Sequence, residues 1–415
     1  MHFLPVFIQL LAFLLATNAY VIPVRRIKTS HRQHQQVPGN SIKKEFVKDI
    51  LTKSTRSRIP TPMFSRQDAN PTPKYVVAHH MVGNTFPYTQ QDWADDIALA
   101  HASGIDGFAL NMGIDEWQPD RVSDAYEAAL QSELDFKLFI SLDMSSFPGA
   151  TPDDAQVLRN IILNFTSHPN QLQINSQAFV STFAGESSTF GQPSVPEGWN
   201  NEFVGHPDLQ GKIHFNPSFF IDPTTFGDFR DVMDGDFNWN SGWPIDLTTE
   251  FVRNLLSSSS TNGNPLASLL PGLTQITSND VSNIDLSSDI VNDALTQVIG
   301  SIQPDETHLQ SLDLLSDNIT ARSVTDDIKP TYMAAVSPCF FTHYGADSYN
   351  KNFAYLYDHH LYIKRWESLI TTRDQIDIVQ ILTWNDYGES HYIGPIKGAQ
   401  PNSEAWVDGM NHTGE

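Results

Sequence analysis

The chain has 415 residues, of which 40% are hydrophobic and 18% charged, so it can bury a sizeable core and is not disordered throughout. Its formal net charge of −23 argues against nucleic acid and anionic membranes as partners, and it favours an uncharged substrate. With a single cysteine, Cys339, the chain has neither a disulfide framework nor a thiolate zinc cluster.

Residues 1–20 are expected to be a secretory signal peptide. The apolar run from Phe3 to Ala16 is too short to span a bilayer, and small residues follow it. Residues 21–73 are basic, polar and proline-punctuated, and we interpret them as a pro-segment or a disordered lead-in. We therefore expect a secreted protein, extracellular or in the cell wall, with no membrane contact once the signal is removed. Three sequons fit this route, at Asn164, Asn318 and Asn411.

From residue 74 onwards, apolar runs rich in β-forming residues alternate with helical patterns. Near-continuous apolar strands separated by helices are typical of a parallel sheet and predict an α/β fold, a (β/α)8 TIM barrel over residues 74–415. A doubly wound open sheet would alternate in the same way, but no Gly-x-Gly-x-x-Gly follows the first strand. The expected strands are Tyr75–Met81, Gly107–Met112, Lys137–Leu142, Ala178–Phe183, Lys212–Ile221, Gly235–Trp239, Tyr332–Val336 and Ile378–Trp384. The expected helices include Gln90–Ala102, Asp120–Gln131, Asp153–Phe165 and Tyr355–Thr372.

Two regions depart from this pattern. Residues 257–329 are rich in Ser, Asn, Asp, Thr and Leu and hold no aromatic residue, so we expect a poorly ordered surface insertion. The sequence ends at Glu415, soon after the eighth strand. We therefore expect a barrel truncated after that strand, with apolar surface left bare for want of a covering helix.

In such a barrel the chemistry lies just beyond the carboxyl ends of the strands. His79 and His80 are adjacent there, so their side chains point to opposite faces, and we expect one to line a pocket while the other packs. The residues expected to bind substrate at these positions are His79, His80, Asn111, Asp143, Asp236, Asn238, Trp239, Asn240, Trp243, His343, Trp384, Asn385, Tyr387 and His391.

Three chemistries compete for this set. Metal-assisted hydrolysis lacks a His-x-His pair on the first strand and any His-Glu-x-x-His, so no metal is expected. Serine chemistry lacks Gly-x-Ser-x-Gly, and Cys339 is best interpreted as a small hydrophobe. Glycoside hydrolysis needs two carboxyl groups and aromatic platforms, and the segment after the last strand supplies Asp386 and Glu389 among aromatic residues. The alternative is a loop in which Asp386 caps a helix and Glu389 is solvated.

Six runs of the sequence stand out together: Val77-Ala-His-His-Met-Val-Gly-Asn-Thr85, Tyr88-Thr-Gln-Gln-Asp-Trp93, Gly104-Ile-Asp-Gly-Phe-Ala-Leu-Asn111, Phe136-Lys-Leu-Phe-Ile-Ser-Leu-Asp143, Asn238-Trp-Asn-Ser-Gly-Trp243 and Ile381-Leu-Thr-Trp-Asn-Asp-Tyr-Gly-Glu-Ser-His-Tyr-Ile-Gly-Pro395. These runs resemble the fungal glycoside hydrolase family 71. The resemblance covers about 74–255 and 331–411, and it implies a (β/α)8 catalytic domain that cleaves α-1,3-glucan internally, with inversion and without a cofactor. It also implies that Asp386 and Glu389 are the catalytic carboxylates. A departure from the pattern is Cys339, which stands where a tryptophan is expected.

The expected activity is therefore hydrolysis of α-1,3-glucan in fungal cell walls. Inversion requires carboxyl groups roughly 6.5–9.5 Å apart, which two residues on an extended strand end can span. We assign Glu389 as the acid and Asp386 as the base, with Asp143, Asp236 and Asn240 holding sugar hydroxyls. The alternative from another class is a carbohydrate-binding pseudoenzyme, inactive through truncation.

Overall fold

The computed structural model describes residues 74–242, 300–315, 329–338, 340–343, 352–354 and 361–401. The expected signal peptide, the lead-in, Trp243, Cys339 and the carboxyl-terminal residues 402–415 lie outside this part of the chain. Within the described part, none of the helices combines the length and the apolar character needed to cross a membrane.

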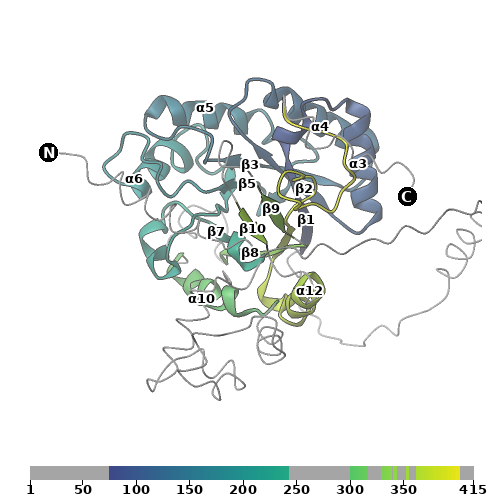
Figure 1. Cartoon of the computed structure of the whole chain (residues 1–415). Coiled ribbons are helices and arrows are strands. Elements are labelled where there is room, and N and C mark those ends of the chain that lie inside the picture. Colours follow the sequence, from purple (N-terminus) through teal and green to yellow (C-terminus); the bar gives the residue numbers. More distant parts are fainter. Residues whose placement is uncertain are drawn as a thin grey trace, which may run out of the picture. The chain divides into compact units, whose positions relative to one another are not determined.

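One curled sheet of parallel strands forms the centre of the fold (Figure 1). Its strands are adjacent in the order β6-β5-β3-β2-β1-β11-β8-β7, so the last strand in sequence is hydrogen-bonded to the first. Each of the predicted strands is present, although the predicted 212–221 shortens to β6. The bounds are β1 (Tyr75–Met81), β2 (Gly107–Met112), β3 (Lys137–Asp143), β5 (Gln177–Phe183), β6 (Ile213–Phe215), β7 (Gly235–Asn238), β8 (Thr331–Val336) and β11 (Ile378–Ile381).

The two end strands of the sheet, β6 and β7, meet through the residues that flank them. The backbone amide of Asp234 donates to the carbonyl of Phe215 at 2.8 Å, and that of Phe237 donates to Pro217 at 3.0 Å. The carboxylate of Asp234 in turn accepts from the Phe215 amide at 2.8 Å. The sheet therefore curls until its edges touch, and the predicted α/β, barrel-like fold is confirmed at that level.

Helices cover the outer face of the sheet. The two that follow β1 and β3 each begin with a capping box, in which Thr89 pairs with Asp92 and Thr151 with Asp154. The α-helices are α3 (Gln90–Ala102), α4 (Gln118–Ser132), α5 (Pro152–Leu163), α6 (Val195–Trp199), α10 (Gln303–Ser311) and α12 (Leu361–Thr371). Single turns of 3-10 or π-helix are η1 (Val82–Thr85), η2 (Asn200–Val204), η3 (Pro223–Phe229), η4 (Trp239–Gly242), η7 (Leu312–Leu315) and η8 (Arg373–Gln375), and minor strands are β4 (Gln173–Ile174), β9 (Phe341–His343) and β10 (Asn352–Ala354).

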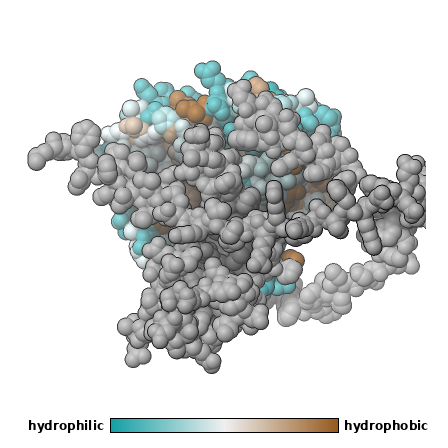
Figure 2. Space-filling view, in the orientation of Figure 1, coloured by the Kyte–Doolittle hydropathy of each residue, from teal (hydrophilic) through white to brown (hydrophobic). Residues whose placement is uncertain are grey.

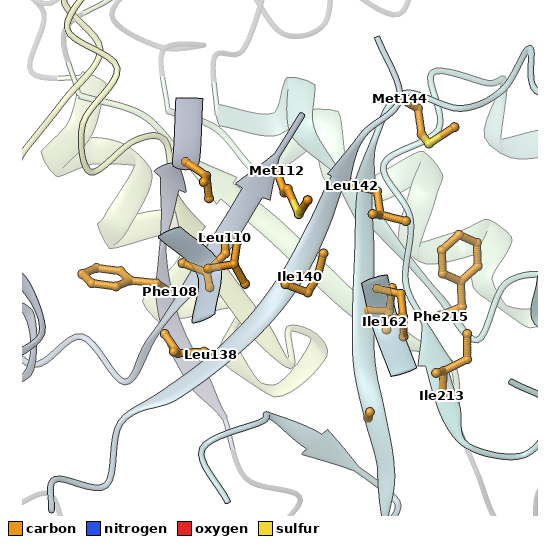
Figure 3. Packing of buried hydrophobic residues seen from close by; sticks show 14 of the residues in the cluster. Phe108, Leu110, Met112, Leu138, Ile140, Leu142, Met144, Ile162, Ile213 and Phe215 are labelled. Atoms are coloured by element: carbon orange, nitrogen blue, oxygen red, sulfur yellow. The ribbon is translucent and has the colours of Figure 1, made fainter. Parts of the chain in front are cut away.

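Strand alternation divides the buried side chains between two clusters. On β2, Phe108 and Leu110 belong to the larger cluster, together with residues of the covering helices such as Ile162 (Figure 3). Ala109, between them, belongs to a smaller cluster formed by residues of the strands and of positions next to strand ends, which includes Phe139 of β3. The larger cluster is thus the layer between sheet and helices, and the smaller one is the interior of the curled sheet.

Residues 300–315 correct the predicted insertion over 257–329. Asp305 on α10 is fully buried and makes a two-pronged ion pair with Arg365 on α12, at 2.6 and 2.8 Å. Leu312 and Leu315 join the larger cluster. A segment without aromatic residues can therefore pack on the sheet through a buried ion pair and leucines. The other residues of 257–329, apart from Lys329, lie outside the described part.

The coloured residues that are visible in Figure 2 are mixed in hydropathy. Where its residues are coloured, hydrophilic ones predominate and hydrophobic ones lie scattered between them. Isolated exposed hydrophobic side chains are ordinary on a protein surface.

Candidate functional site

The loop that follows β11 doubles back on itself at the carboxyl end of the sheet. The Ile393 amide donates to the carbonyl of Thr383 at 3.0 Å, and the Gly394 amide donates to that of Trp384 at 2.8 Å. Nearer the tip, the His391 amide donates to the carbonyl of Asp386 at 2.9 Å. These bonds enclose a short turn over residues 386–390, which we call the carboxylate turn.

The carboxylate turn brings Asp386, Glu389 and His391 together. One possible ligand atom from each of the three lies within 4.8 Å of those of the other two. The backbone amide of Asp386 donates to Thr383 Oγ1 at 2.8 Å, and the amide of Glu389 donates to Asp386 Oδ1 at 3.3 Å. The expected extended strand end is thus wrong: because the chain turns here, the carboxylates approach more closely than the predicted roughly 6.5–9.5 Å.

His391 supports this pair from the buried side. Its side chain is 1% exposed, its Nε2 lies 2.7 Å from Ser337 Oγ, and the Phe340 ring stacks on it at 4.2 Å between ring centroids. Burial, and after it the proximity of His79, holds the pKa of His391 well below its usual range, so the imidazole is neutral. It therefore does not fit the predicted role of binding sugar hydroxyls from solvent.

His79 lies on the inner face of β1, below the mouth of the curled sheet. Its Nδ1 is 2.8 Å from the side-chain nitrogen of Gln380, and its ring meets Trp239 edge-on at 4.9 Å. Burial, followed by the nearby His80, lowers the pKa of His79 to about 3. Trp239 itself is half-buried and also touches Phe183 at 4.8 Å. Of the two adjacent histidines, His79 is thus the one that faces the interior of the curled sheet.

Other predicted residues also lie at the carboxyl ends of the strands. Asn111, 4% exposed, is opposite Met81 in the β1–β2 register. Asp143 ends β3 and accepts hydrogen bonds from the amide and hydroxyl of Ser145 at 3.1 and 2.5 Å. Asn240, in η4, is exposed. His343 ends β9, where its backbone pairs with Asn352 of β10.

Three predicted substrate ligands are instead on the outer face of the sheet. His80 alternates with His79 and lies 3.3 Å from the Asp96 carboxylate of α3. Because Phe237 points inward, Asp236 and Asn238 point outward beneath α10. Asp236 there contacts His308 at 2.8 Å, and Asn238 donates to the carbonyl of Pro304 at 2.8 Å. His80, Asp236 and Asn238 therefore lie outside the candidate site.

Three more predicted ligands are buried supports of the carboxylate turn. Trp384 is 2% exposed and packs on Phe108, 5.1 Å between ring centroids, so it presents no face to a sugar. Asn385 is fully buried and binds both backbone groups of Met81, accepting at 2.7 Å and donating at 3.0 Å. The hydroxyl of Tyr387 donates to the carbonyl of Pro395 at 2.8 Å. These contacts fix the loop rather than bind a ligand.

Sequence reasoning missed the residues that hold this site in place. Ser337, Phe340 and Thr383 touch the site directly, yet no spacing marks them. Asp96 did carry a signal, because it shares the helical spacing of the apolar residues Trp93 and Ala100 on α3. A carboxylate on the buried face of a helix needs hydrogen-bonding or ionic partners, and the partners of Asp96 connect α3 with the chain around the carboxylate turn.

Asp386, Glu389 and His391 are also the one group of three potential metal ligands among the residues that the structure describes. Two carboxylates and an imidazole are donors that a divalent cation accepts. His391 Nε2 lies against Ser337 Oγ. The same three groups suit acid–base chemistry equally well.

Comparisons with known proteins identify the family of the chain. The model of glycosyl hydrolase family 71 matches residues 72–268 and 307–414. A glucan endo-1,3-alpha-glucosidase of Schizosaccharomyces pombe is 38% identical over 350 residues, which are 82% of this chain and 63% of the relative. The ascus wall endo-1,3-alpha-glucanase of the same yeast is 32% identical, over 82% of this chain and 63% of the relative. A mutanase of Penicillium rubens is 30% identical, over 82% of this chain and 58% of the relative.

The chain thus spans about three fifths of the length of these curated relatives. Among solved structures, the family 99 endo-alpha-mannosidase of Bacteroides thetaiotaomicron superposes with a TM-score of 0.46 at 10% identity, over 80% of this chain and 96% of that chain. That likeness is too weak to bear on function. The family model matches most of the sequence, in two segments separated by residues 269–306. The chain therefore belongs to glycosyl hydrolase family 71.

Proposed function

We propose that this chain hydrolyses α-1,3-glucan at internal linkages, with Asp386 and Glu389 as its catalytic pair. The observation that carries the proposal is the meeting of these two carboxylates at the carboxyl end of a barrel-like sheet, backed by His391. The names of the curated relatives, which are endo-1,3-α-glucanases, support the substrate. An uncharged polysaccharide also suits a chain with a net charge of −23.

In the proposed reaction, Glu389 is the acid and Asp386 is the base. Glu389 protonates the glycosidic oxygen as the bond to the anomeric carbon breaks, and Asp386 removes a proton from the water that attacks that carbon. The assignment follows from the hydrogen bonds. The Glu389 amide donates to Asp386 Oδ1, which stabilises the charged form of Asp386 that a base requires. Glu389 is half-buried, so its carboxyl group can reach a sugar that enters from solvent.

Inversion, the stereochemistry that the family resemblance implies, needs a wider gap between the carboxyl groups. Asp386 is fixed by Thr383 Oγ1 and by the Glu389 amide, whereas the longer side chain of Glu389 has three torsions through which it can withdraw. We propose that an entering sugar moves the Glu389 carboxyl group away and admits the water. Proton NMR of the first product then shows the β-anomer. An α-anomer would assign the close pair to a retaining mechanism.

The sugar is proposed to lie over the mouth of the curled sheet. The half-buried ring of Trp239 offers a stacking face. Asp143, at the end of β3, and Asn240, just after β7, lie at the same end of the sheet, where they can bind hydroxyls. We further propose that the enzyme is secreted after removal of residues 1–20 and acts outside the cell on cell-wall glucan.

Two substitutions test the catalytic pair. In the purified full chain, Asp386→Asn and Glu389→Gln are each expected to lower reducing-sugar release from insoluble α-1,3-glucan by at least about 10²-fold, because each removes one acid–base group. Glucan pull-down should be unchanged. Glu116→Gln is the matched control, since Glu116 is an exposed carboxylate in the loop after β2.

The outcomes separate the alternatives. A folded, glucan-binding variant with near-normal turnover would show that the substituted carboxylate is not catalytic. A wild-type chain that binds glucan but releases no sugar would instead favour the carbohydrate-binding pseudoenzyme.

A further inference from the structure

The chain beyond the carboxylate turn lies back against that turn. We call residues 394–400 the strap. The hydroxyl of Tyr387, inside the turn, donates to the carbonyl of Pro395 at 2.8 Å, and the Lys397 amide donates to that hydroxyl at 3.3 Å. Tyr387, which lies between Asp386 and Glu389 in the sequence, therefore connects the strap to the carboxylate turn.

The strap also packs tightly on the loop after β1. A Cβ added to Gly398 would lie 2.2 Å from the carbonyl oxygen of Asn84 and 2.8 Å from the Tyr88 ring, so only glycine fits there. Asn84 itself donates to the carbonyl of Asn385 at 2.9 Å. One loop thus contacts both the strap and the start of the carboxylate turn.

The strap is anchored by a buried carboxylate on α3. Asp96 is fully buried, and the Lys397 ammonium lies 2.7 Å from its Oδ1. Its Oδ2 accepts from the Tyr88 hydroxyl at 2.9 Å and lies 3.3 Å from His80 Nε2. Burial, as the largest cause, lowers the pKa of His80, so Lys397 is the lasting positive charge beside Asp96. A buried carboxylate without a cation is costly, which ties Lys397 to this position.

We propose that Asp96, acting through Lys397 and Tyr387, is a positioning residue that holds the carboxylate turn in its reactive geometry. This inference rests on the proposed function of Asp386 and Glu389. Displacement of a reacting group by about 1 Å can cost on the order of 10²-fold in rate, so an anchor one segment away can control turnover.

The test compares two buried ion pairs on the outside of the same sheet. Lys397→Met and Asp96→Asn are expected to lower kcat at least tenfold and to leave the KM for soluble α-1,3-glucan oligosaccharides within twofold. Lys397→Arg keeps the charge and should recover most of the rate. The control is Asp305→Asn, which breaks the ion pair with Arg365. The other hydrogen bonds of that pair, among the described residues, join it to Tyr332, Ala335 and Ser301 rather than to the strap or the turn. Its loss should therefore lower stability without the selective loss of kcat.

A second readout does not depend on catalysis. Hydrogen exchange of the Glu389 and His391 amides, both bonded within the turn, should accelerate in Lys397→Met and not in Asp305→Asn. Near-normal kcat and unchanged exchange in folded Lys397→Met would overturn the proposal. So would an equal loss of kcat in Asp305→Asn of matched stability. If wild type does not cleave glucan but the exchange still responds, the positioning role stands and the proposed function fails.

Discussion

The ion pair between Asp305 and Arg365 sets a strong expectation for stability. Both side chains are at most 1% exposed, and besides its two bonds to Arg365, Asp305 accepts from the Tyr332 hydroxyl at 2.7 Å. Arg365 also donates to the carbonyls of Ala335 and Ser301, each at 3.0 Å. Asp305→Asn keeps the shape but leaves a guanidinium charge buried without a countercharge. Breaking a buried pair in this way typically costs about 3–5 kcal/mol.

The expected size can be converted into a melting temperature. A folded unit of roughly 300 residues has an unfolding entropy of about 0.6 kcal/mol per kelvin, so Asp305→Asn should lower Tm by about 5–8 °C. Differential scanning calorimetry and urea titration measure the change. Asp313→Asn is the control, because Asp313 is exposed on the adjoining turn and should change stability by at most about 0.5 kcal/mol.

A double variant checks the cause. Replacing both partners, as Asp305→Leu with Arg365→Met, removes both charges and should recover much of the loss, since two apolar groups need no countercharge. A Tm for Asp305→Asn within about 1 °C of wild type would refute the reasoning, because it would mean that the guanidinium finds other compensation.

Two further outcomes follow from buried groups near the site. Because burial lowers the pKa of His79 to about 3, only the unfolded chain takes up this proton as pH falls from 6.5. Stability should therefore decrease by about 2 kcal/mol per such histidine between pH 7 and pH 5. Over this pH range the urea midpoint should fall less in His79→Gln than in wild type. In His101→Gln, an exposed helical control, it should fall as it does in wild type. Asn385→Ala leaves both backbone groups of Met81 without their side-chain partner and should destabilise by about 2–4 kcal/mol while lowering turnover. A cost below about 1 kcal/mol in the same titration would mean that other contacts hold the loop.

The strands were predictable because each is a nearly continuous apolar run between helical patterns. The helix Gln90–Ala102 was predicted to the residue, and the structure adds the capping box at Thr89 that fixes its start. The prediction was wrong about the side of the sheet on which particular side chains lie. Asp236 and Asn238 were assigned to the mouth because they lie at a strand end. They face outward because Phe237 occupies the interior and because α10, from a segment interpreted as a surface insertion, packs over them.

The candidate site was predictable in its residue types but not in its geometry. Asp386 and Glu389 stood out as carboxylates among aromatic residues after an apolar strand. Their separation depends on the carboxylate turn, and that turn depends on bonds to Met81 and Asn84, about three hundred residues earlier in the sequence. No local pattern reports such partners. Likewise, Trp384 and Tyr387 resemble sugar platforms in the sequence, yet the surrounding chain buries both.

The two hydrogen bonds between the Asn385 side chain and the backbone of Met81 on β1 also have a consequence for how the protein folds. It joins residues 304 positions apart, and β1 and β11 pair over a similar span, so these contacts close very large loops. Contacts of such high contact order form slowly and depend on the structure between them. The carboxylate turn is thus completed only when the first and last strands have met. Partly folded chains, including those still being synthesised, lack the assembled pair of carboxylates, so the proposed catalytic site forms only together with closure of the sheet.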